Sequence, residues 1–340
     1  MVSHPVRFAE QLTIGDDKSR NSRYFATRWQ ALCSTRLMSS SIPLIDFSGI
    51  LSDSISERKA LAEEVDRSAK EVGFMYITNC GIAPETVKAV MSTAHRFFGM
   101  DSETKNGFMF DQELNFGYHG MGKEALDPSK PADQKETFTM RNVSNFYSQS
   151  ELWPSFHYRQ VASDFFADCQ RLADRMMSAF ALALDLPESF FTNKHTGTLQ
   201  TLRFLLYPPT TVESSGQLGA GAHTDYGTLT LLFQDQSGGL EIQDSEGNWI
   251  PAPPIESAVV INSGDLLARW TNDVYRSTPH RVQVRPADAT NGRLSIAFFS
   301  DPDPEVLVET LPSCVSEESP SKYPPITAND HILEKIAATN

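Results

Sequence analysis

The stretch from Gly221 to Phe233, GAHTDYGTLTLLF, places a histidine and an aspartate two residues apart before an alternating apolar run. Side chains at positions i and i+2 of a strand share a face, so we expect His223 and Asp225 to project together. His280 lies in a second β-rich run, STPHRVQV. Two histidines and one carboxylate suit an octahedral Fe(II) ion with three open positions, and zinc accepts the same ligands. Because an H-x-D pair also arises by chance, the pattern alone leaves the metal site a hypothesis.

The elements that must position these residues belong to a β-rich C-terminal half. After residue 198, short runs of β-favouring residues alternate with glycine, proline and Asn-Asp turn signals. Strands are predicted over residues 199–207, 227–233, 239–243, 258–262, 280–285 and 293–300. Several short strands separated by turns predict an antiparallel sandwich or barrel. The chain then ends in a predicted helix, DHILEKIAAT.

The N-terminal half is richer in helices. An S-x-x-E capping box at Ser54 predicts the start of one helix, and Pro84 predicts the first turn of another. The apolar run from Phe74 to Cys80 predicts a buried strand between them. A long helix is predicted from after Ser155 to near Leu186. Residues 106–150 lack periodicity, and long irregular segments of this kind often form lids over a site.

The composition is that of a folded protein, and the charge excludes some partners. The 340 residues carry 29 Lys and Arg against 43 Asp and Glu, a formal net charge of −14. We therefore expect no nucleic-acid partner and no docking on an anionic membrane. No stretch approaches the roughly 20 apolar residues of a membrane span. The four cysteines form no C-x-x-C pair, so we expect reduced thiols and a cytoplasmic protein.

The N-terminal segment is open to two interpretations. Residues 1–40 are predicted to be a poorly ordered extension. Residues 1–37 contain several arginines and serines, as transit peptides do, but Glu10, Asp16 and Asp17 weaken that interpretation. The sequence alone does not decide whether this segment targets the protein.

The C-terminal motifs, taken as a set, resemble those of the iron- and 2-oxoglutarate-dependent dioxygenases of the isopenicillin N synthase-like family. They read HTDYGTLTLLFQD, GGLEIQ, GNWIPAPP, VVINSGDLLARWTND, YRSTPHRV and RLSIAFF. The N-terminal half adds IPLIDFSGI, EVGFMYITNCGI and DQKETF, which are similar to that family's N-terminal region. The resemblance implies an α+β fold with a double-stranded β-helix (jelly-roll) core flanked by helices. We expect a helix-rich region over residues 41–195 and the jelly-roll core over residues 196–340, joined as one unit.

The resemblance also implies roles for individual residues. The H-x-D motif and the later HRV make His223, Asp225 and His280 the iron ligands and catalytic centre. The turn INSGD, residues 261–265, is expected to be structural. The strand motif NCG has Cys80 where many relatives have histidine, a change we expect to affect packing rather than chemistry.

A second set of residues is implied for the co-substrate. The R-x-S motif matches Arg293 and Ser295, which share a strand face and would bind the 5-carboxylate of 2-oxoglutarate through the arginine fork. Tyr207, in LLYPP, matches a tyrosine that bonds the same carboxylate. Leu205 stands where many relatives have asparagine, so one amide contact to the co-substrate is lost.

The reaction implied is oxygenation of a small molecule. Fe(II), 2-oxoglutarate and O₂ are the expected cofactor and co-substrates, with ascorbate as a supporting reductant and succinate and CO₂ as products. Hydroxylation is the default outcome, and desaturation or ring closure are open alternatives. Two other interpretations are an oxidase of the isopenicillin N synthase type, which uses no 2-oxoglutarate, and a non-catalytic metal-binding relative.

Substrate contacts are predicted less directly. Phe299 matches a position that stacks against aromatic substrates in relatives, and a plain core role is the alternative. Thr137, Thr139 and Arg141 alternate along a predicted strand and so share a face. With Tyr118 they are the candidate pocket residues. We expect a natural product or a nucleobase-type compound as substrate, and a monomeric enzyme.

Overall fold

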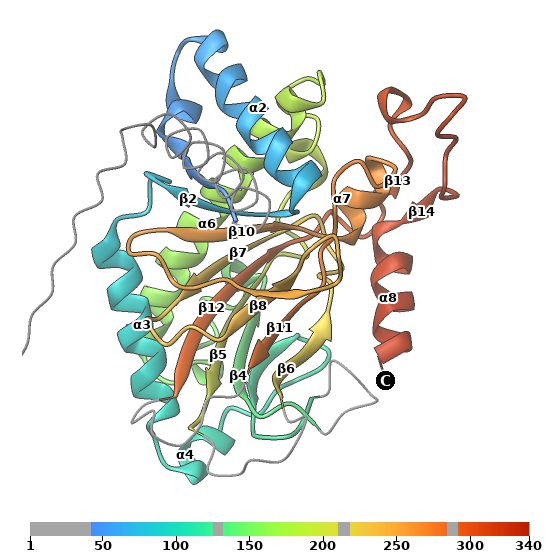
Figure 1. Ribbon diagram of the computed structural model, residues 1–340. Coiled ribbons are helices and arrows are strands. Elements are labelled where there is room, and N and C mark those ends of the chain that lie inside the picture. Colours follow the sequence, from blue (N-terminus) through green and yellow to red (C-terminus); the bar gives the residue numbers. More distant parts are fainter. Residues whose placement is uncertain (1–41, 125–131, 210–217, 284–291, 340) are drawn as a thin grey trace, which may run out of the picture. The chain divides into compact units, whose positions relative to one another are not determined.

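The computed structural model describes residues 42–124, 132–209, 218–283 and 292–339. The predicted extension over residues 1–40 lies outside these residues. From Ile42 onward the chain forms one compact unit, built on two β-sheets with helices on the outside (Figure 1). None of the described helices combines the length and the apolar character needed to cross a bilayer.

A large sheet and a small sheet face each other across a shared apolar layer. The large sheet contains, in spatial order, β1 (Leu44–Asp46), β2 (Phe74–Thr78), β10 (Val259–Ser263), β7 (Leu229–Gln234), β12 (Arg293–Ser300), β5 (Thr201–Tyr207), β4 (Glu136–Arg141) and β3 (Phe116–His119). The small sheet contains β6 (Leu218–His223), β11 (His280–Gln283), β8 (Leu240–Gln243) and β9 (Trp249–Pro251). The short strands β13 (Leu307–Val308) and β14 (Ile326–Thr327) pair with each other.

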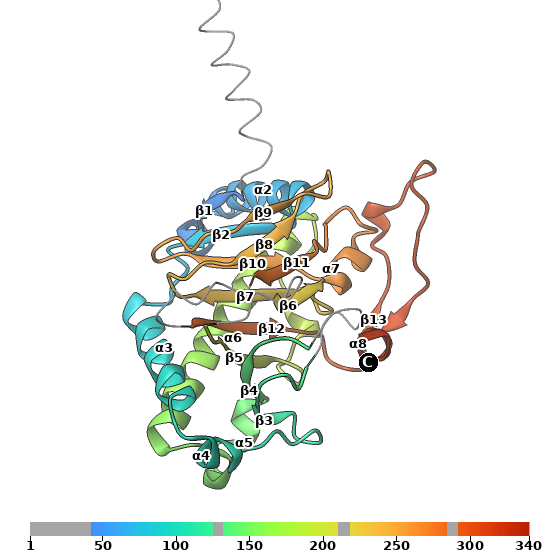
Figure 2. The same cartoon turned by 60° about the horizontal axis from the view of Figure 1, so that its bottom comes forward.

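Helices cover the outer face of the large sheet (Figures 1 and 2). The α-helices are α2 (Ile55–Glu71), α3 (Pro84–Phe98), α4 (Ser102–Asn106), α5 (Val143–Phe146), α6 (Phe156–Ala183), α7 (Asp265–Trp270) and α8 (Ala328–Thr339). Short 3₁₀ helices occur at η1 (Phe47–Leu51), η2 (Ser150–Leu152), η3 (Thr192–Lys194) and η4 (Pro312–Cys314). The α+β class and the flanking of a jelly-roll core by helices, both expected from the sequence, are confirmed.

Local sequence signals explain where the main helices begin. The Ser54 side chain accepts a hydrogen bond from the backbone N–H of Glu57, so the predicted cap of α2 forms. Pro84 is the first residue of α3, where its missing N–H costs nothing. Ser155 caps α6 by accepting from the N–H of Tyr158 at 3.0 Å. The predicted start of each of these helices is therefore confirmed.

The alternation along β12 shows how one strand serves two purposes. Leu294, Ile296 and Phe298 point to the helical side, where Phe298 meets Phe166 of α6 with ring centroids 5.2 Å apart. The intervening residues point toward the small sheet and line a cavity. Strand β7 is arranged in the same way, with Phe233 stacked edge-on against Phe165 at 4.9 Å. Burial of these aromatic side chains, worth about 1.5–3 kcal/mol each, holds α6 on the sheet.

The structure also contains strands that the sequence analysis did not predict. Strand β6 ends at His223 and pairs with β11, and β9 adds an outer edge to the small sheet. The segment 106–150, predicted to be irregular apart from a strand that carries Thr137, Thr139 and Arg141, contributes that strand as β4 and also the unpredicted β3, which both extend the large sheet. The glycines there broke the periodic pattern, and Gly117 is needed because its positive φ and the backbone of Met109 leave no space for a side chain.

Candidate active site

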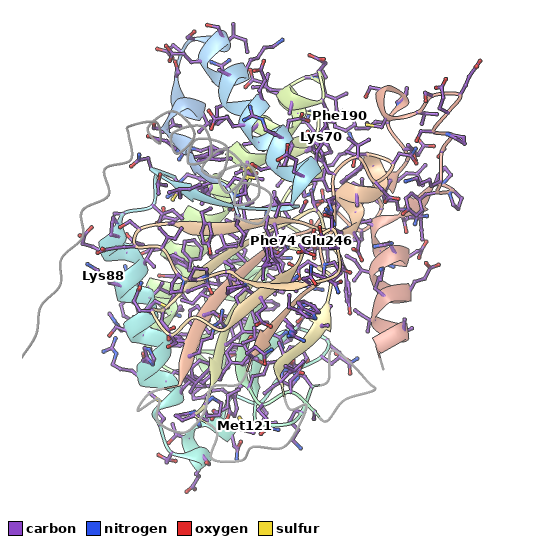
Figure 3. The ribbon with its side chains drawn as sticks, in the orientation of Figure 1. Lys70, Phe74, Lys88, Met121, Phe190 and Glu246 are labelled. Carbon is purple, nitrogen blue, oxygen red and sulfur yellow. The ribbon has the colours of Figure 1, made fainter. Side chains whose placement is uncertain are left out.

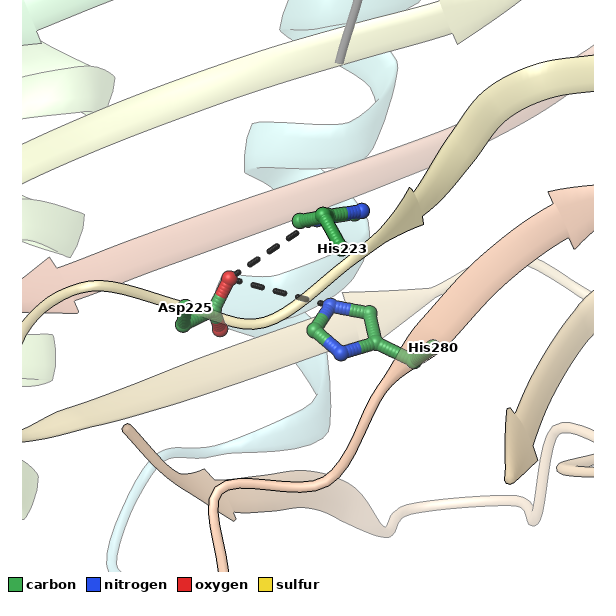
Figure 4. A group of neighbouring side chains, drawn as sticks. All are labelled: His223, Asp225 and His280. Atoms are coloured by element: carbon green, nitrogen blue, oxygen red, sulfur yellow. Dashed lines mark ion pairs between the residues drawn. The ribbon is translucent and has the colours of Figure 1, made fainter. Parts of the chain in front are cut away.

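Three potential metal ligands meet where the small sheet opens toward the large one. His223 ends β6 and His280 begins β11, and the two residues are directly opposite in the antiparallel pairing. Oδ1 of Asp225 lies 3.8 Å from Nε2 of His223 and 3.7 Å from Nε2 of His280 (Figure 4). Among the described residues this is the only trio of histidine, cysteine or acidic side chains whose ligand atoms all lie within 4.8 Å of one another.

Backbone carbonyls hold both imidazole rings in the orientation that a metal ligand needs. Nδ1 of His223 lies 2.8 Å from the carbonyl oxygen of Gly221, and Nδ1 of His280 lies 3.2 Å from that of Thr278. Because a carbonyl only accepts, Nδ1 carries a proton in each ring, which leaves Nε2 as the atom that can bind a metal. Burial, together with the neighbouring His280, lowers the pKa of His223 to about 3, so that ring is neutral at physiological pH.

Two side chains orient the carboxylate of Asp225. Its Oδ2 accepts hydrogen bonds from Oγ1 of Thr230 at 2.5 Å and from Nδ2 of Asn262 at 2.7 Å, so Oδ1 faces the histidines. Burial would raise the pKa of Asp225, but the two histidines and these hydrogen bonds outweigh burial and lower the pKa. The carboxylate of Asp225 and the Nε2 atoms of the two imidazole rings therefore converge on one point.

The physical reason for this convergence differs from the one expected. His223 is the last residue of β6, and Asp225 lies outside the strand, so the two residues do not share a strand face. Instead, the N–H of Asp265 donates to the carbonyl oxygen of Asp225 at 2.8 Å and holds the bend. Phe74, labelled in Figure 3, supports His280 with an edge-on ring contact at 5.3 Å.

The sequence analysis missed the two residues that orient Asp225. Asn262 belongs to the INSGD turn, which was expected to be structural and which also donates to the candidate metal ligand. Thr230 is a polar residue in the apolar run of β7, on the face opposite Leu229 and Leu231. A threonine within an otherwise apolar strand was the sequence signal that could have identified Thr230 as a functional residue.

The R-x-S residues form a buried cationic group at the other side of the cavity. Arg293 is 6% exposed, and its Nη1 donates to Oγ of Ser295 at 2.9 Å. Its Nη2 donates to Oε1 of Gln234 at 3.1 Å, and its Nε has no hydrogen-bond partner among the described residues. Tyr207 pairs with Arg293 across β5 and β12, and the guanidinium carbon lies 5.0 Å from the centre of its ring. The predicted trio is thus brought together, and Gln234 is a fourth member that the sequence did not reveal.

One cavity of about 1010 Å³ contains both groups. Residues at alternating positions of β5, β7 and β12 form its floor, including Leu205, Leu232 and Ala297, while Val282 and Leu240 come from the small sheet. Leu205, where the resemblance implied the loss of an amide contact, is 7% exposed and gives this wall an apolar surface.

Three of the five candidate substrate residues line this cavity. They are Phe299 on β12 and Thr139 and Arg141 on β4. Thr137 shares their strand face, but its hydroxyl accepts a hydrogen bond from Nη2 of Arg203 at 3.2 Å and it is not part of the lining.

Tyr118 does not reach the cavity, contrary to the expectation. In the β3–β4 pairing Tyr118 is opposite Phe138, so it points to the helical side, where its ring lies 5.7 Å from that of Phe97. Its hydroxyl donates to Glu136. The neighbouring His119 is opposite Thr137 and lines the cavity instead. The sequence analysis gave Tyr118 no strand register, and neighbouring residues of a strand point to opposite faces of the sheet.

A charged network closes one end of the cavity. Glu124 forms an ion pair with Arg203 and lies 3.4 Å from Nζ of Lys135. Lys135 is 2% exposed at its side chain and also pairs with Asp133 at 2.7 Å. Asp133 in turn accepts a hydrogen bond from the backbone N–H of Gly221, two residues before His223, at 3.0 Å. The network therefore links Arg203 of β5 and Lys135, the residue before β4, to β6, the strand that carries His223.

A carboxyl group that the sequence analysis did not single out also faces the cavity. Asp301 follows Phe299 by two residues and lies beside Gly227, where its carboxylate occupies the space that a side chain would fill. Burial raises the pKa of Asp301 to about 7, although the positive charge of Arg141 lowers it. No repeated motif or spacing marks this residue.

Comparisons with known proteins agree with the fold and the site. The family model described as the 2OG-Fe(II) oxygenase superfamily matches residues 188–302. The model described as the N-terminal region of non-haem dioxygenase in morphine synthesis matches residues 42–159.

Individual relatives cover most of the chain. The 2-oxoglutarate-Fe(II) type oxidoreductase ppzC of Metarhizium rileyi (strain RCEF 4871) is 31% identical over 330 residues, 87% of each chain. The proline hydroxylase buaE of Petromyces alliaceus is 31% identical over 299 residues, 82% of this chain and 93% of that protein. The crystal structure of a full-length Neurospora crassa protein in complex with alpha-KG and thymine superposes with a TM-score of 0.78 at 33% identity, over 88% of this chain and 97% of that one.

The chain belongs to the 2OG-Fe(II) oxygenase superfamily. It is an oxidoreductase that uses Fe(II), 2-oxoglutarate and O₂. The residues present fit both groups: two imidazole nitrogens and a carboxylate oxygen suit Fe(II), and a buried guanidinium with an unpartnered Nε suits a carboxylate.

Proposed function

We propose that His223, Asp225 and His280 bind the Fe(II) of this enzyme. The observation that carries the proposal is the convergence of three ligand atoms, each with its other polar atoms already occupied by backbone carbonyls or by polar side chains. Three protein ligands held rigidly in this way would bind Fe(II) and leave room in its coordination sphere for reactants.

Arg293, Ser295 and Tyr207 are proposed to bind the distal carboxylate of 2-oxoglutarate. When bound, iron and 2-oxoglutarate supply the oxidising chemistry, in which 2-oxoglutarate and O₂ yield succinate, CO₂ and an oxygenated product. Arg293 would orient the co-substrate by a charge-assisted pair in a dry environment. The apolar wall formed by Leu205 and Leu232 would exclude water from the reacting centre.

The substrate is proposed to be a small ring compound that is hydroxylated beside Phe299. Phe299 lies in the same cavity as the metal ligands, and the similar Neurospora crassa protein, solved with thymine, supports a nucleobase-type ring. A cyclic natural product is the second candidate, supported by the likeness to the proline hydroxylase buaE. Either ring can stack on an aromatic side chain.

Two measurements test these assignments separately. His223→Ala should abolish tight Fe(II) binding in an anaerobic titration, and unchanged affinity would remove His223 from the ligand set. A screen of ring compounds for substrate-stimulated succinate formation should identify at least one substrate. If no compound stimulates succinate formation, the proposed substrate class is wrong while the metal assignment stands on its own titration.

The proposal also covers the domain organisation, the oligomeric state and the cellular location of the protein. The helix-rich region up to residue 195 and the jelly-roll core act as one unit, since β1 to β4 of the first region are built into the large sheet. We propose a monomeric cytoplasmic enzyme, in keeping with the free thiols of Cys80, Cys169 and Cys314. Sedimentation analysis and cell fractionation test these two points.

A further inference from the structure

A row of paired residues crosses the large sheet and leads to the candidate metal centre. In the strand pairing, Arg141 on β4 is opposite Thr201 on β5, and Thr201 is opposite Phe299 on β12. Phe299 is in turn opposite Thr230 on β7, whose hydroxyl donates to Asp225. Because neighbouring strands lie about 4.8 Å apart, this row places β4 about 14 Å from β7. That span suits one ring-sized molecule between the Arg141 side chain and the metal ligands.

Arg141 has hydrogen-bond donors to offer to such a molecule. Its Nε donates to Oγ1 of Thr201 at 3.2 Å. In the amide orientation that satisfies both side chains, the oxygen of Asn115 lies 3.0–3.1 Å from all three guanidinium nitrogens. An oxygen equidistant from all three nitrogens must lie over the face of the guanidinium, so it leaves the in-plane N–H groups of Nη1 and Nη2 available. Within the described ranges no acidic group forms an ion pair with Arg141 within 4.0 Å.

The other guanidinium groups of the cavity, and its buried lysine, are already engaged. Arg203 is paired with Glu124, and Lys135 is paired with Asp133. Arg293 lies at the far side, bonded to Ser295 and Gln234. Arg141 is therefore the guanidinium in this lining with an unused hydrogen-bonding edge near Phe299.

Asp301 supplies an acceptor on the same side. It lies two residues beyond Phe299 and interacts electrostatically with Arg141, without a direct ion pair. Gly227 makes this placement possible, because a Cβ at that position would overlap the Asp301 carboxylate. A donor edge and an acceptor thus flank one aromatic ring.

We propose that Arg141 and Asp301 form the specificity site of this enzyme and recognise a cyclic –CO–NH– edge, as in a lactam or an imide. The carbonyl oxygen accepts from Nη of Arg141, the N–H donates to Asp301, and the ring lies over Phe299. This inference rests on the proposed function and narrows its substrate class. A flat carboxylate fits less well, since its negative charge would lie beside Asp301.

Binding is tested with the enzyme loaded with Fe(II) and 2-oxoglutarate under anaerobic conditions, by calorimetry. The probes are thymine, hydantoin and cyclo(glycylglycine), each compared with its fully N-methylated form, and benzoate as the flat acid. At least one probe should bind, and its N-methylated form should bind about 10- to 100-fold more weakly because a charge-assisted hydrogen bond is lost. Failure of all three probes to bind, equal binding of the methylated form, or preferential binding of benzoate would overturn the proposal.

Substitutions distinguish this substrate site from the sites proposed for Fe(II) and 2-oxoglutarate. Asp301→Asn and Arg141→Gln should each weaken binding of the best probe by about 10- to 100-fold. Both should leave the affinity for 2-oxoglutarate and for Fe(II) unchanged. Asp303→Asn is the matched control, because Asp303 accepts from the N–H of Thr196 and does not line the cavity. Loss of 2-oxoglutarate affinity in the two site variants would place them with the co-substrate instead, and would leave the iron assignment untouched.

Discussion

Replacing Glu124 with glutamine removes the carboxylate at the centre of the charged network. Burial alone would raise the pKa of Glu124, but the positive charges of Arg203 and Lys135 outweigh burial and lower the pKa from 4.5 to about 2. This lowering of the pKa corresponds to about 3 kcal/mol of folding free energy at neutral pH. The side chain is 23% exposed, so solvent screens only part of this interaction.

The sign of the pH dependence follows from the lowered pKa. The stabilisation is fully present above the unfolded-state pKa of 4.5 and is lost as the pH falls toward 2. Roughly 40% of it should remain at pH 3. Urea unfolding of the wild type and of Glu124→Gln at pH 7, 4 and 3 measures the difference between the two proteins at each pH. That difference should be about 3 kcal/mol at pH 7 and should shrink steadily with acid.

A control substitution distinguishes the loss of the charged network from the general effect of removing one negative charge. Glu113 is exposed, and Glu113→Gln removes a carboxylate of the same kind outside the network. We expect its unfolding free energy to stay within about 0.5 kcal/mol of the wild type. If the destabilisation of Glu124→Gln were the same at pH 7 and pH 3, the reasoning from charge pairing would be refuted, and loss of shape or packing would have to explain it.

Three further substitutions address the metal, the co-substrate and the fold. Asn262→Ala should weaken Fe(II) binding about 10- to 100-fold in a metal titration, because Asp225 loses one orienting hydrogen bond; unaltered affinity would mean that Thr230 alone suffices. Arg293→Lys should weaken 2-oxoglutarate binding at least about 10-fold in calorimetry, since lysine lacks the planar fork, whereas Fe(II) affinity should be retained. Ser54→Ala should lower the unfolding free energy by about 1 kcal/mol through loss of the α2 cap, and any effect on Fe(II) affinity would contradict a purely local role.

Much of the fold could be predicted because local rules and tertiary packing agree there. Capping at Ser54 and Ser155 and the apolar alternation of β12 are properties of short segments, and the structure shows each of them. Strand β6 was missed because its sequence, LGAGAH, has small residues and little β-propensity, and pairing with β11 decides its conformation. Neither partner strand alone reveals that pairing.

The ligand residues of the candidate site could be predicted from the sequence, but the residues that orient them could not. His223, Asp225 and His280 were found from residue type and motif, and the structure brings them together. The reason first given for their convergence was wrong, since Asp225 lies beyond the end of the strand. Gln234 reaches Arg293 because β7 is next to β12 in the sheet, and Asp301 faces the cavity because Gly227 leaves space for its carboxylate. Neither the order of the strands nor this space can be read from the sequence.

The two faces of β12 have a consequence for how this enzyme could change its specificity. Odd-numbered positions from Arg293 to Phe299 face the reactants, and the even-numbered positions between them face α6 and its neighbours. Ala297 and Phe299 are the positions of the first face that are not assigned to 2-oxoglutarate. Substitutions there can accumulate without disturbing the helical packing, so new substrates can be accommodated by point changes. A one-residue insertion or deletion within the strand would exchange the faces, expelling Phe298 from its packing while burying Arg293 in it. We expect natural and laboratory variants with new substrates to differ by replacements here and to keep the length of the strand constant.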